Sequence, residues 1–375
     1  MTAALLLLAA CGSTQPPGPA ATTIPATEPL MTVDTPIPPT VTPEPVSGTS
    51  TWPTRRYAHF MAYDPQSDQV LLFNGHDKKV GGWGYERLDE ESKARDEWAY
   101  DVDQNRMEFL RTAPYTVYNK TAYDEQSRRL VAFGADDTAV YDLENKAWQK
   151  TEPEEQPGTW RHGFSLAYDS QSDRTILFGG NPHGSLLNDT WAYDYETNTW
   201  TEMSPDVSPS PRDGHAMAYD TESDRIILWG ANEVGNPPMS EEEKATVWVY
   251  DYETNTWTAI ESTGGPSYRG GHTMVYHPGT DRIILFGGYQ LGEVDFSDET
   301  WAYDYSANTW TQLTPSTHPS GRRLFSMVYA EGADKIVLFG GMAGNFLKEE
   351  TSDELWIFDP VSDEWSQVMP DSLNP

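Results

Sequence analysis

The sequence predicts an all-β fold built from six repeats of four antiparallel strands. A nonapeptide that ends in Ala-Tyr-Asp or a close variant recurs six times. Each copy is followed by an apolar segment that ends at or near a glycine pair, and then by a segment such as Trp-Ala-Tyr-Asp. Internal repetition of short strands and turns is typical of architectures made of stacked units.

The four predicted strands of each repeat are located by these recurring segments. The nonapeptides, which carry the first strands, are 56–64, 116–124, 161–169, 212–220, 269–277 and 322–330. The second strands begin at Val70, Leu130, Thr175, Ile226, Ile283 and Ile336. The third strands begin at Trp98, Ala139, Trp191, Trp248, Trp301 and Trp356. The fourth strands carry Met107, Trp148, Trp200, Trp257, Trp310 and Trp365. Turns rich in Asp and Asn join these strands, since both side chains bond their own backbone.

The order of Arg-x-Gly-His, glycine pair, Trp-x-Tyr-Asp and a closing Trp resembles the kelch repeat of the galactose oxidase/kelch-like superfamily. The resemblance covers 54–368 and implies a six-bladed β-propeller with four antiparallel strands per blade. The six blades would be about 54–112, 113–152, 159–203, 210–260, 267–313 and 320–369. The resemblance also implies that the first strand of each blade is innermost.

The composition excludes some classes of protein. The formal net charge of −33 argues against binding to nucleic acid, which needs clusters of Lys and Arg. A hydrophobic content of 37% can fill a core, so the acidity does not indicate a disordered chain.

The N-terminal residues predict a tether. Residues 3–10 read AALLLLAA and precede Cys11, the single cysteine. The segment 1–11 resembles a bacterial lipoprotein signal, in which Cys11 would be lipidated. Because no Lys or Arg precedes the short apolar run, we expect the natural start to lie upstream of Met1. Residues 12–50, rich in Pro and Thr, predict a disordered linker before a propeller at 51–375. We therefore expect an extracytoplasmic protein held on the bacterial cell membrane by its lipid alone.

The two ends of the predicted propeller differ. Antiparallel strands place the first-to-second and third-to-fourth turns at one end, called the turn end, and the second-to-third loops at the other, called the loop end. The turn end gathers aspartates, for which turn stabilisation is favoured over a calcium-binding rim.

Arginines and aromatic residues mark the loop end as the candidate site. Five first strands begin with an arginine, and five guanidinium groups around one mouth would bind carboxylate, sulfate or phosphate. The alternative is that each arginine pairs with a loop carboxylate or carbonyl. Exposed aromatic residues of the loops would add a stacking surface for a sugar or a peptide. The predicted ligand-binding residues are Arg56, Arg161, Arg212, Arg269, Arg322, Trp83, Tyr85, Tyr118 and Tyr289.

His59, His215 and His272 invite a metal hypothesis. They share a strand face with Met and Tyr, and Phe164 and Phe325 replace them in other repeats, which favours core packing. We expect no metal and no cofactor.

The sequence favours a binding module over an enzyme. Its predicted partner is a protein, a glycan or a sugar acid. The alternatives are a mutarotase or epimerase of the bacterial kelch type, or a purely structural propeller for adhesion or assembly. A galactose oxidase cofactor, which uses a Tyr crosslinked to Cys, is argued against because Cys11 lies in the predicted signal. No catalytic residue is singled out.

Overall fold

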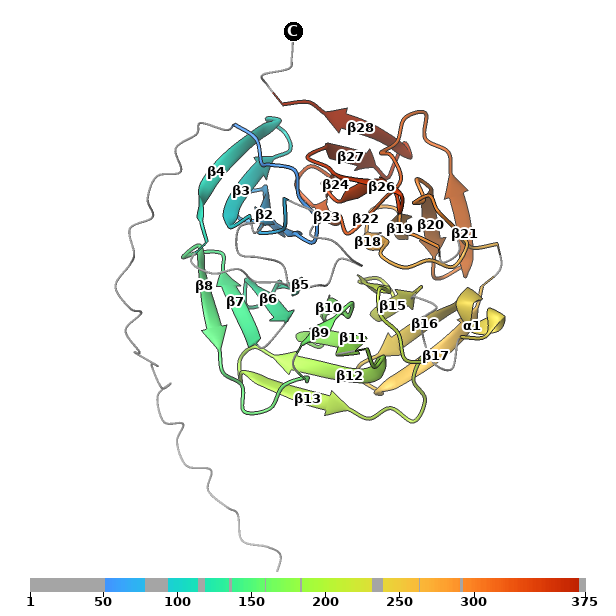
Figure 1. Cartoon of the computed structure of the whole chain (residues 1–375). Helices are drawn as coiled ribbons and strands as arrows, with labels where there is room; N and C mark the ends of the chain where they lie inside the picture. Colours follow the sequence, from blue (N-terminus) through green and yellow to red (C-terminus); the bar gives the residue numbers. More distant parts are fainter. Residues whose placement is uncertain are drawn as a thin grey trace, which may run out of the picture. The chain divides into compact units, whose positions relative to one another are not determined.

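The computed structural model describes residues 51–77, 94–113, 119–134, 137–158, 160–182, 184–230, 239–262, 264–290 and 293–370. They belong to one compact unit, Ser47–Pro375, arranged as a ring of sheets (Figure 1). Within these residues, six sheets each contain a path of four antiparallel strands in chain order. The predicted all-β class with four-stranded antiparallel units is therefore confirmed.

The first three sheets follow one another along the chain. The first contains β1 (Phe60–Asp64), β2 (Gln69–Phe73), β3 (Asp96–Asp101) and β4 (Arg106–Thr112). The second contains β5 (Asn119–Asp124), β6 (Arg129–Gly134), β7 (Asp137–Asp142) and β8 (Ala147–Thr151). The third contains β10 (Ser165–Asp169), β11 (Arg174–Pro182), β12 (Leu187–Asp194) and β13 (Thr199–Met203), and β9 (Arg161–His162) pairs with β11.

The other three sheets complete the series. The fourth contains β14 (Ala216–Asp220), β15 (Arg225–Trp229), β16 (Thr246–Asp251) and β17 (Thr256–Glu261), with α1 (Glu241–Ala245) before β16. The fifth contains β18 (Thr273–His277), β19 (Arg282–Phe286), β20 (Thr300–Asp304) and β21 (Thr309–Leu313). The sixth contains β23 (Ser326–Ala330), β24 (Lys335–Phe339), β27 (Leu355–Asp359) and β28 (Glu364–Val368). A small sheet at its loop end contains β22 (Arg322–Arg323), β25 (Met342–Asn345) and β26 (Lys348–Thr351).

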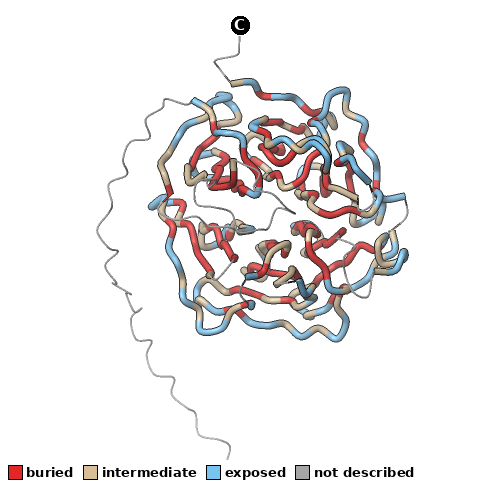
Figure 2. Tube along the Cα trace, viewed as in Figure 1, coloured by how far each residue is buried: buried red, intermediate tan, exposed pale blue. Residues whose placement is uncertain are grey.

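The core lies between neighbouring sheets. Each first strand contacts the first strand of the next sheet, from β1 through β5, β10, β14 and β18 to β23, and β23 contacts β1. Apolar residues of two neighbouring sheets form each of the six core clusters, including one that joins the sixth sheet to the first. Buried residues accordingly follow the strands of every sheet (Figure 2). A sheet without neighbours would leave these faces in water, so the sheets stabilise one another.

Four-residue turns join the strands at the turn end, and the last residue of each turn is in the left-handed region. Tyr63 donates a hydrogen bond across one turn to Asp68 at 2.6 Å, and Asp64 accepts one from the backbone of Gln66 at 3.1 Å. In four of the third-to-fourth turns Asn takes the left-handed position, and Tyr100 donates to Asn105 at 3.0 Å in one of them, whereas Lys146 and Asp363 take it in the second and sixth sheets. The prediction that these acidic residues stabilise turns is confirmed.

The first strands begin later than the nonapeptides. Arg56 precedes β1, because Ala58 has a φ of +50° and interrupts the extended backbone before Phe60. In the described ranges there is no helix of the length and apolar character that crossing a bilayer requires.

Candidate functional site

The five arginines of the loop end are buried and paired within their own repeats. Arg161 forms two hydrogen bonds with Asp189, at 2.6 and 2.7 Å, and one with the carbonyl of Gly179 at 2.9 Å. Arg56 forms the same two-bond pair with Asp96, whereas three other arginines each bond one oxygen of a glutamate: Arg212 with Glu243, Arg269 with Glu299 and Arg322 with Glu354. Because a buried guanidinium needs partners for its charge, these groups are not free to receive a ligand. The alternative of internal pairing is therefore confirmed, and it argues against the ligand ring, which stays a prediction.

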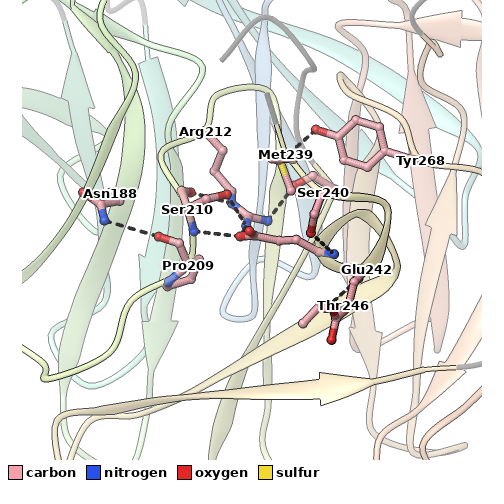
Figure 3. A network of polar contacts seen from close by, with 11 residues as sticks. Asn188, Pro209, Ser210, Arg212, Met239, Ser240, Glu242, Thr246 and Tyr268 are labelled. Carbon is pink, nitrogen blue, oxygen red and sulfur yellow. Dashed lines mark hydrogen bonds and ion pairs between the residues drawn. The ribbon is translucent and has the colours of Figure 1, made fainter. Parts of the chain in front are cut away.

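Burial and charge act against each other in these pairs. Burial lowers the pKa of Arg212 to about 10, although Glu243 opposes the effect. Burial also disfavours the charged form of Asp96, but its hydrogen bonds and the charge of Arg56 outweigh burial and hold its pKa below the usual value. Figure 3 shows Arg212 beside Ser210, whose carbonyl accepts from the guanidinium at 3.0 Å. The arginines thus hold the loop end together.

A short motif marks the carboxylate partners. In four repeats an Asp or Glu lies two positions before the tryptophan of the third strand, and the indole also donates to it, as Trp191 does to Asp189 at 2.7 Å. The fourth repeat has Thr246 at this position, so Glu243 of α1 pairs with Arg212 instead. Within the described ranges, the indole nitrogen of Trp248 has no hydrogen-bond partner.

Glycine pairs allow neighbouring sheets to approach. Gly180 donates a backbone hydrogen bond to the carbonyl of Arg212 at 2.8 Å, and Gly341 donates the same bond to Arg56 at 2.8 Å. A Cβ on Gly340 would lie 2.6 Å from the Arg56 carbonyl oxygen, which no side chain could occupy without displacement. The sixth sheet therefore joins the first sheet by the same backbone hydrogen bond that joins the third sheet to the fourth.

The three histidines pack in the core. His59, His215 and His272 each meet an aromatic ring of the preceding sheet edge-on, at centroid distances of 5.5, 5.5 and 5.2 Å. Burial lowers the pKa of His59 and of His272 to about 3 and that of His215 well below its usual value. The prediction that they are core residues is confirmed.

The residues directly after the arginines form what we call the inner rim: Tyr57, His162, Asp213, Gly270 and Arg323. They lie at the loop end, and the backbone just beyond them is bonded from sheet to sheet, as by the N–H of Gly214 to the carbonyl of Gly163 at 2.7 Å. Gly270 contributes no side chain, but it forms a backbone β-bridge with Tyr289, whose ring lies 3.1 Å from where a Cβ on Gly271 would stand.

Arg323 is enclosed by aromatic rings. Its guanidinium lies 5.7 Å from the ring centre of Tyr289, 5.4 Å from that of Phe296 and 5.2 Å from that of Phe346. Its Nη2 donates to buried Glu349 at 2.8 Å. Cation–π attraction and this ion pair hold the side chain in place.

Asp213 carries an unsatisfied acceptor at the rim. It is 5% exposed, and Oδ2 accepts a hydrogen bond from Asn181 at 3.2 Å, while the buried Oδ1 has no hydrogen-bond partner among the residues that the structure describes. Burial raises its pKa. Burial also raises the pKa of Tyr289. The charge of Asp213 adds to this rise and the charge of Arg323 opposes it, so the three groups lie close enough to interact.

The sequence prediction of the site was partial. Of the predicted aromatic residues, Tyr289 belongs to this region, whereas Trp83, Tyr85 and Tyr118 lie outside the described residues. Arg323 and Asp213 were missed because rim residues share no residue type. Their position directly after the repeated arginine was the available signal.

Comparison with known proteins agrees with the repeat pattern. Residues 171–375 match the KLHDC2/KLHL20/DRC7 Kelch-repeats domain. Similar proteins include Adagio protein 3 of Arabidopsis thaliana, 26% identical over 258 residues, which are 63% of this chain and 40% of that protein. Kelch domain-containing protein 1 of Mus musculus is 25% identical over 346 residues, 80% of this chain and 81% of that protein.

The four-stranded sheets and their repeated arginine, glycine and tryptophan positions define a kelch β-propeller. The chain belongs to the kelch-repeat family, whose domains generally mediate protein–protein interaction. It spans about 40% of the length of the Adagio relatives that it matches.

Proposed function

We propose that this chain is a six-bladed kelch propeller that binds a protein partner at the inner rim of its loop end. The number of blades is supported by the closed series of contacts from β1 to β23 and back. It is also supported by the bond from Gly341 to Arg56, which equals an ordinary bond between neighbouring sheets.

The observation that carries the binding proposal is the free oxygen of Asp213. A buried acceptor without a donor costs about 1–3 kcal/mol, so a partner that supplies an N–H or O–H donor there recovers this free energy on binding. Tyr57, His162 and Tyr289 surround the same rim with large side chains, which favour protein recognition. The buried ion pairs of the five neighbouring arginines keep these varied side chains in fixed positions.

A protein partner is better supported than a sugar acid. The hypothesis of a sugar-acid ligand depended on free arginines. All five arginines of the loop end are engaged in ion pairs: Arg56, Arg161, Arg212, Arg269 and Arg322. What remains at the rim is a mixture of aromatic and polar groups, which suits an extended segment of another protein.

The test is a selection of peptides from a random displayed library on the full chain, followed by affinity measurements. We expect the selected peptides to share a motif and to bind about 10–100-fold more weakly to Asp213→Ala. Glu196→Ala, at an exposed position of the turn end, is the matched control and should bind normally. A lack of enrichment, or equal binding by both variants, would contradict the proposal.

We further propose that Cys11 is lipidated and tethers the chain outside a bacterial membrane. The AALLLLAAC segment supports this, because several acyl chains together hold a protein firmly on a bilayer. Radioactive palmitate should label the wild-type chain in a bacterial host, and Cys11→Ser should abolish labelling. Equal labelling of both would contradict the tether.

A further inference from the structure

Asp213 and Glu349 are both buried carboxylates near the inner rim, but their partners differ in charge. The side chain of Glu349 is 2% exposed and pairs with the guanidinium of Arg323 at 2.8 Å. Asp213 accepts instead from the neutral amide of Asn181, with Oδ2 3.2 Å from Nδ2. Throughout the part of the chain that the structure describes, no cationic side chain pairs with Asp213, and its Oδ1 has no donor.

A neutral donor leaves the negative charge of this buried carboxylate unbalanced. Arg212 is adjacent in sequence, but its guanidinium pairs with Glu243 at 2.8 Å. Burial raises the pKa of Asp213, and the hydrogen bond from Asn181 offsets only part of this effect. A neutral donor supplied to Oδ1 would complete its hydrogen bonding, whereas a cation would also balance the charge. The site therefore favours a positively charged group.

Glycine backbone borders Asp213 on both sides. A Cβ on Gly163, in the third repeat, would lie 2.7 Å from the Cβ of Asp213 and 3.4 Å from its carboxyl carbon. On the other side, a Cβ on Gly214 would lie 3.9 Å from the Cα of Gly270, the rim residue of the fifth repeat. These glycines place no side chain beside the carboxylate. Since Asp213 is 5% exposed, the group that reaches it must be slender.

We propose that the protein partner inserts a lysine side chain at the inner rim and pairs its ammonium group with Asp213. An ammonium is a compact charge on a slender stem, and a single free oxygen is enough to bind it. A guanidinium binds best across both oxygens of a carboxylate, and Asn181 already holds Oδ2. The formal charge of −33 attracts a basic segment and speeds its association at low salt. This inference rests on the proposed function and adds the charge of the contact.

The test uses three displayed peptide libraries on the full-length chain. Each has lysine, arginine or glutamine at a fixed central position, and the random flanking residues exclude Lys and Arg. We expect the lysine library to enrich most, and its best peptide to bind roughly 30-fold or more weakly when norleucine replaces its lysine. Asp213→Asn keeps an oxygen acceptor without the charge. It should weaken the lysine peptide by a similar factor and bind the lysine and norleucine peptides almost equally.

Asp353→Asn is the matched control, because it removes the same charge from an exposed carboxylate of the loop end. It should weaken the lysine peptide by about twofold or less. Denaturant titration shows whether Asp213→Asn is folded, and the norleucine peptide tests the contact on the unaltered protein.

Four results would overturn the lysine contact and leave a partner at the rim standing. These are equal enrichment of the glutamine library, dominance of the arginine library, equal affinity of the lysine and norleucine peptides, and equal losses in Asp213→Asn and Asp353→Asn. Enrichment from none of the three libraries would instead overturn the proposed function, and the lysine contact with it.

Discussion

Arg161 and Asp189 form a two-bond ion pair inside the third sheet, with Nη1 2.6 Å from Oδ1 and Nη2 2.7 Å from Oδ2. The arginine side chain is 2% exposed and the aspartate 20%. The pair joins the segment before the first strand to the third strand, and four other repeats hold a buried arginine paired with a carboxylate.

Removal of one partner from this pair should be costly. Arg161→Met leaves the Asp189 carboxylate without its cation, and we expect a loss of about 3–5 kcal/mol in the free energy of unfolding. Denaturant titration measures it. Arg174→Met, which breaks the more exposed pair with Asp194, should cost about 1 kcal/mol or less. Equal losses would show that burial does not strengthen the role of Arg161.

The core histidines should make stability fall in acid. The folded pKa of His59 is about 3 against 6.5 for the free side chain, so between these values the unfolded chain binds more protons. Stability contributed by neutral His59 is thus complete above pH 6.5 and decreases by about 1.4 kcal/mol per pH unit below it. His59→Phe places here the residue that Phe164 and Phe325 already provide elsewhere, and should reduce this slope between pH 6 and 4 by about that amount. An unchanged slope in denaturant titrations at several pH values would refute the assignment.

The glycine at the junction of the last and first sheets should tolerate no side chain. Gly340 has a φ of +65°, and a Cβ would contact the Arg56 carbonyl oxygen at 2.6 Å. We expect Gly340→Ala to lower the free energy of unfolding by about 2–3 kcal/mol. Gly158→Ala, where a Cβ would have no atom within 4 Å and φ is not positive, should change it by about 0.5 kcal/mol or less. If both variants unfolded at the same denaturant concentration, the junction would not be close-packed.

The tyrosine of the first strand should stabilise the turn that follows it. Tyr63 donates to Asp68 at 2.6 Å and accepts from the backbone N–H of Gly332, in the sixth sheet, at 2.8 Å. Burial and this bond to Asp68 raise the pKa of Tyr63 to about 12. Tyr63→Phe removes the hydroxyl alone and should cost about 1–2 kcal/mol, measured by thermal unfolding. Tyr305→Phe is the control at a half-buried position of another turn and should be nearly neutral.

Local repetition predicted the strands well and the pairing of charges poorly. Tyr63 and Asp68 are five positions apart, so the turn could be predicted from sequence. Arg161 and Asp189 are 28 positions apart and meet only because β11 and β12 bring them together. Glu243 could not have been assigned to Arg212 from the repeat, since it comes from an added helix rather than from the third strand.

The inner rim could not be predicted from the sequence for a different reason. The residues after the repeated arginines differ in every sheet, and variation of this kind carries no periodic signal. Tyr289 was predicted as an exposed aromatic residue, yet its interaction with Arg323 depends on the approach of the fifth and sixth sheets. The repeated residues thus predict the strands and sheets, whereas the candidate site consists of residues at positions that differ from repeat to repeat.

The second repeat has a consequence for how such a ring would come apart. It carries Thr116 where five others carry arginine, and Ala139 where they carry tryptophan, so the side chains that brace the loop end elsewhere are missing from its sequence. A circular arrangement of similar units resists rupture only as well as its weakest segment does. Pulled from its two termini or warmed toward its melting point, the molecule should open at β5–β8 first, and amide hydrogens there should exchange ahead of those in the other sheets.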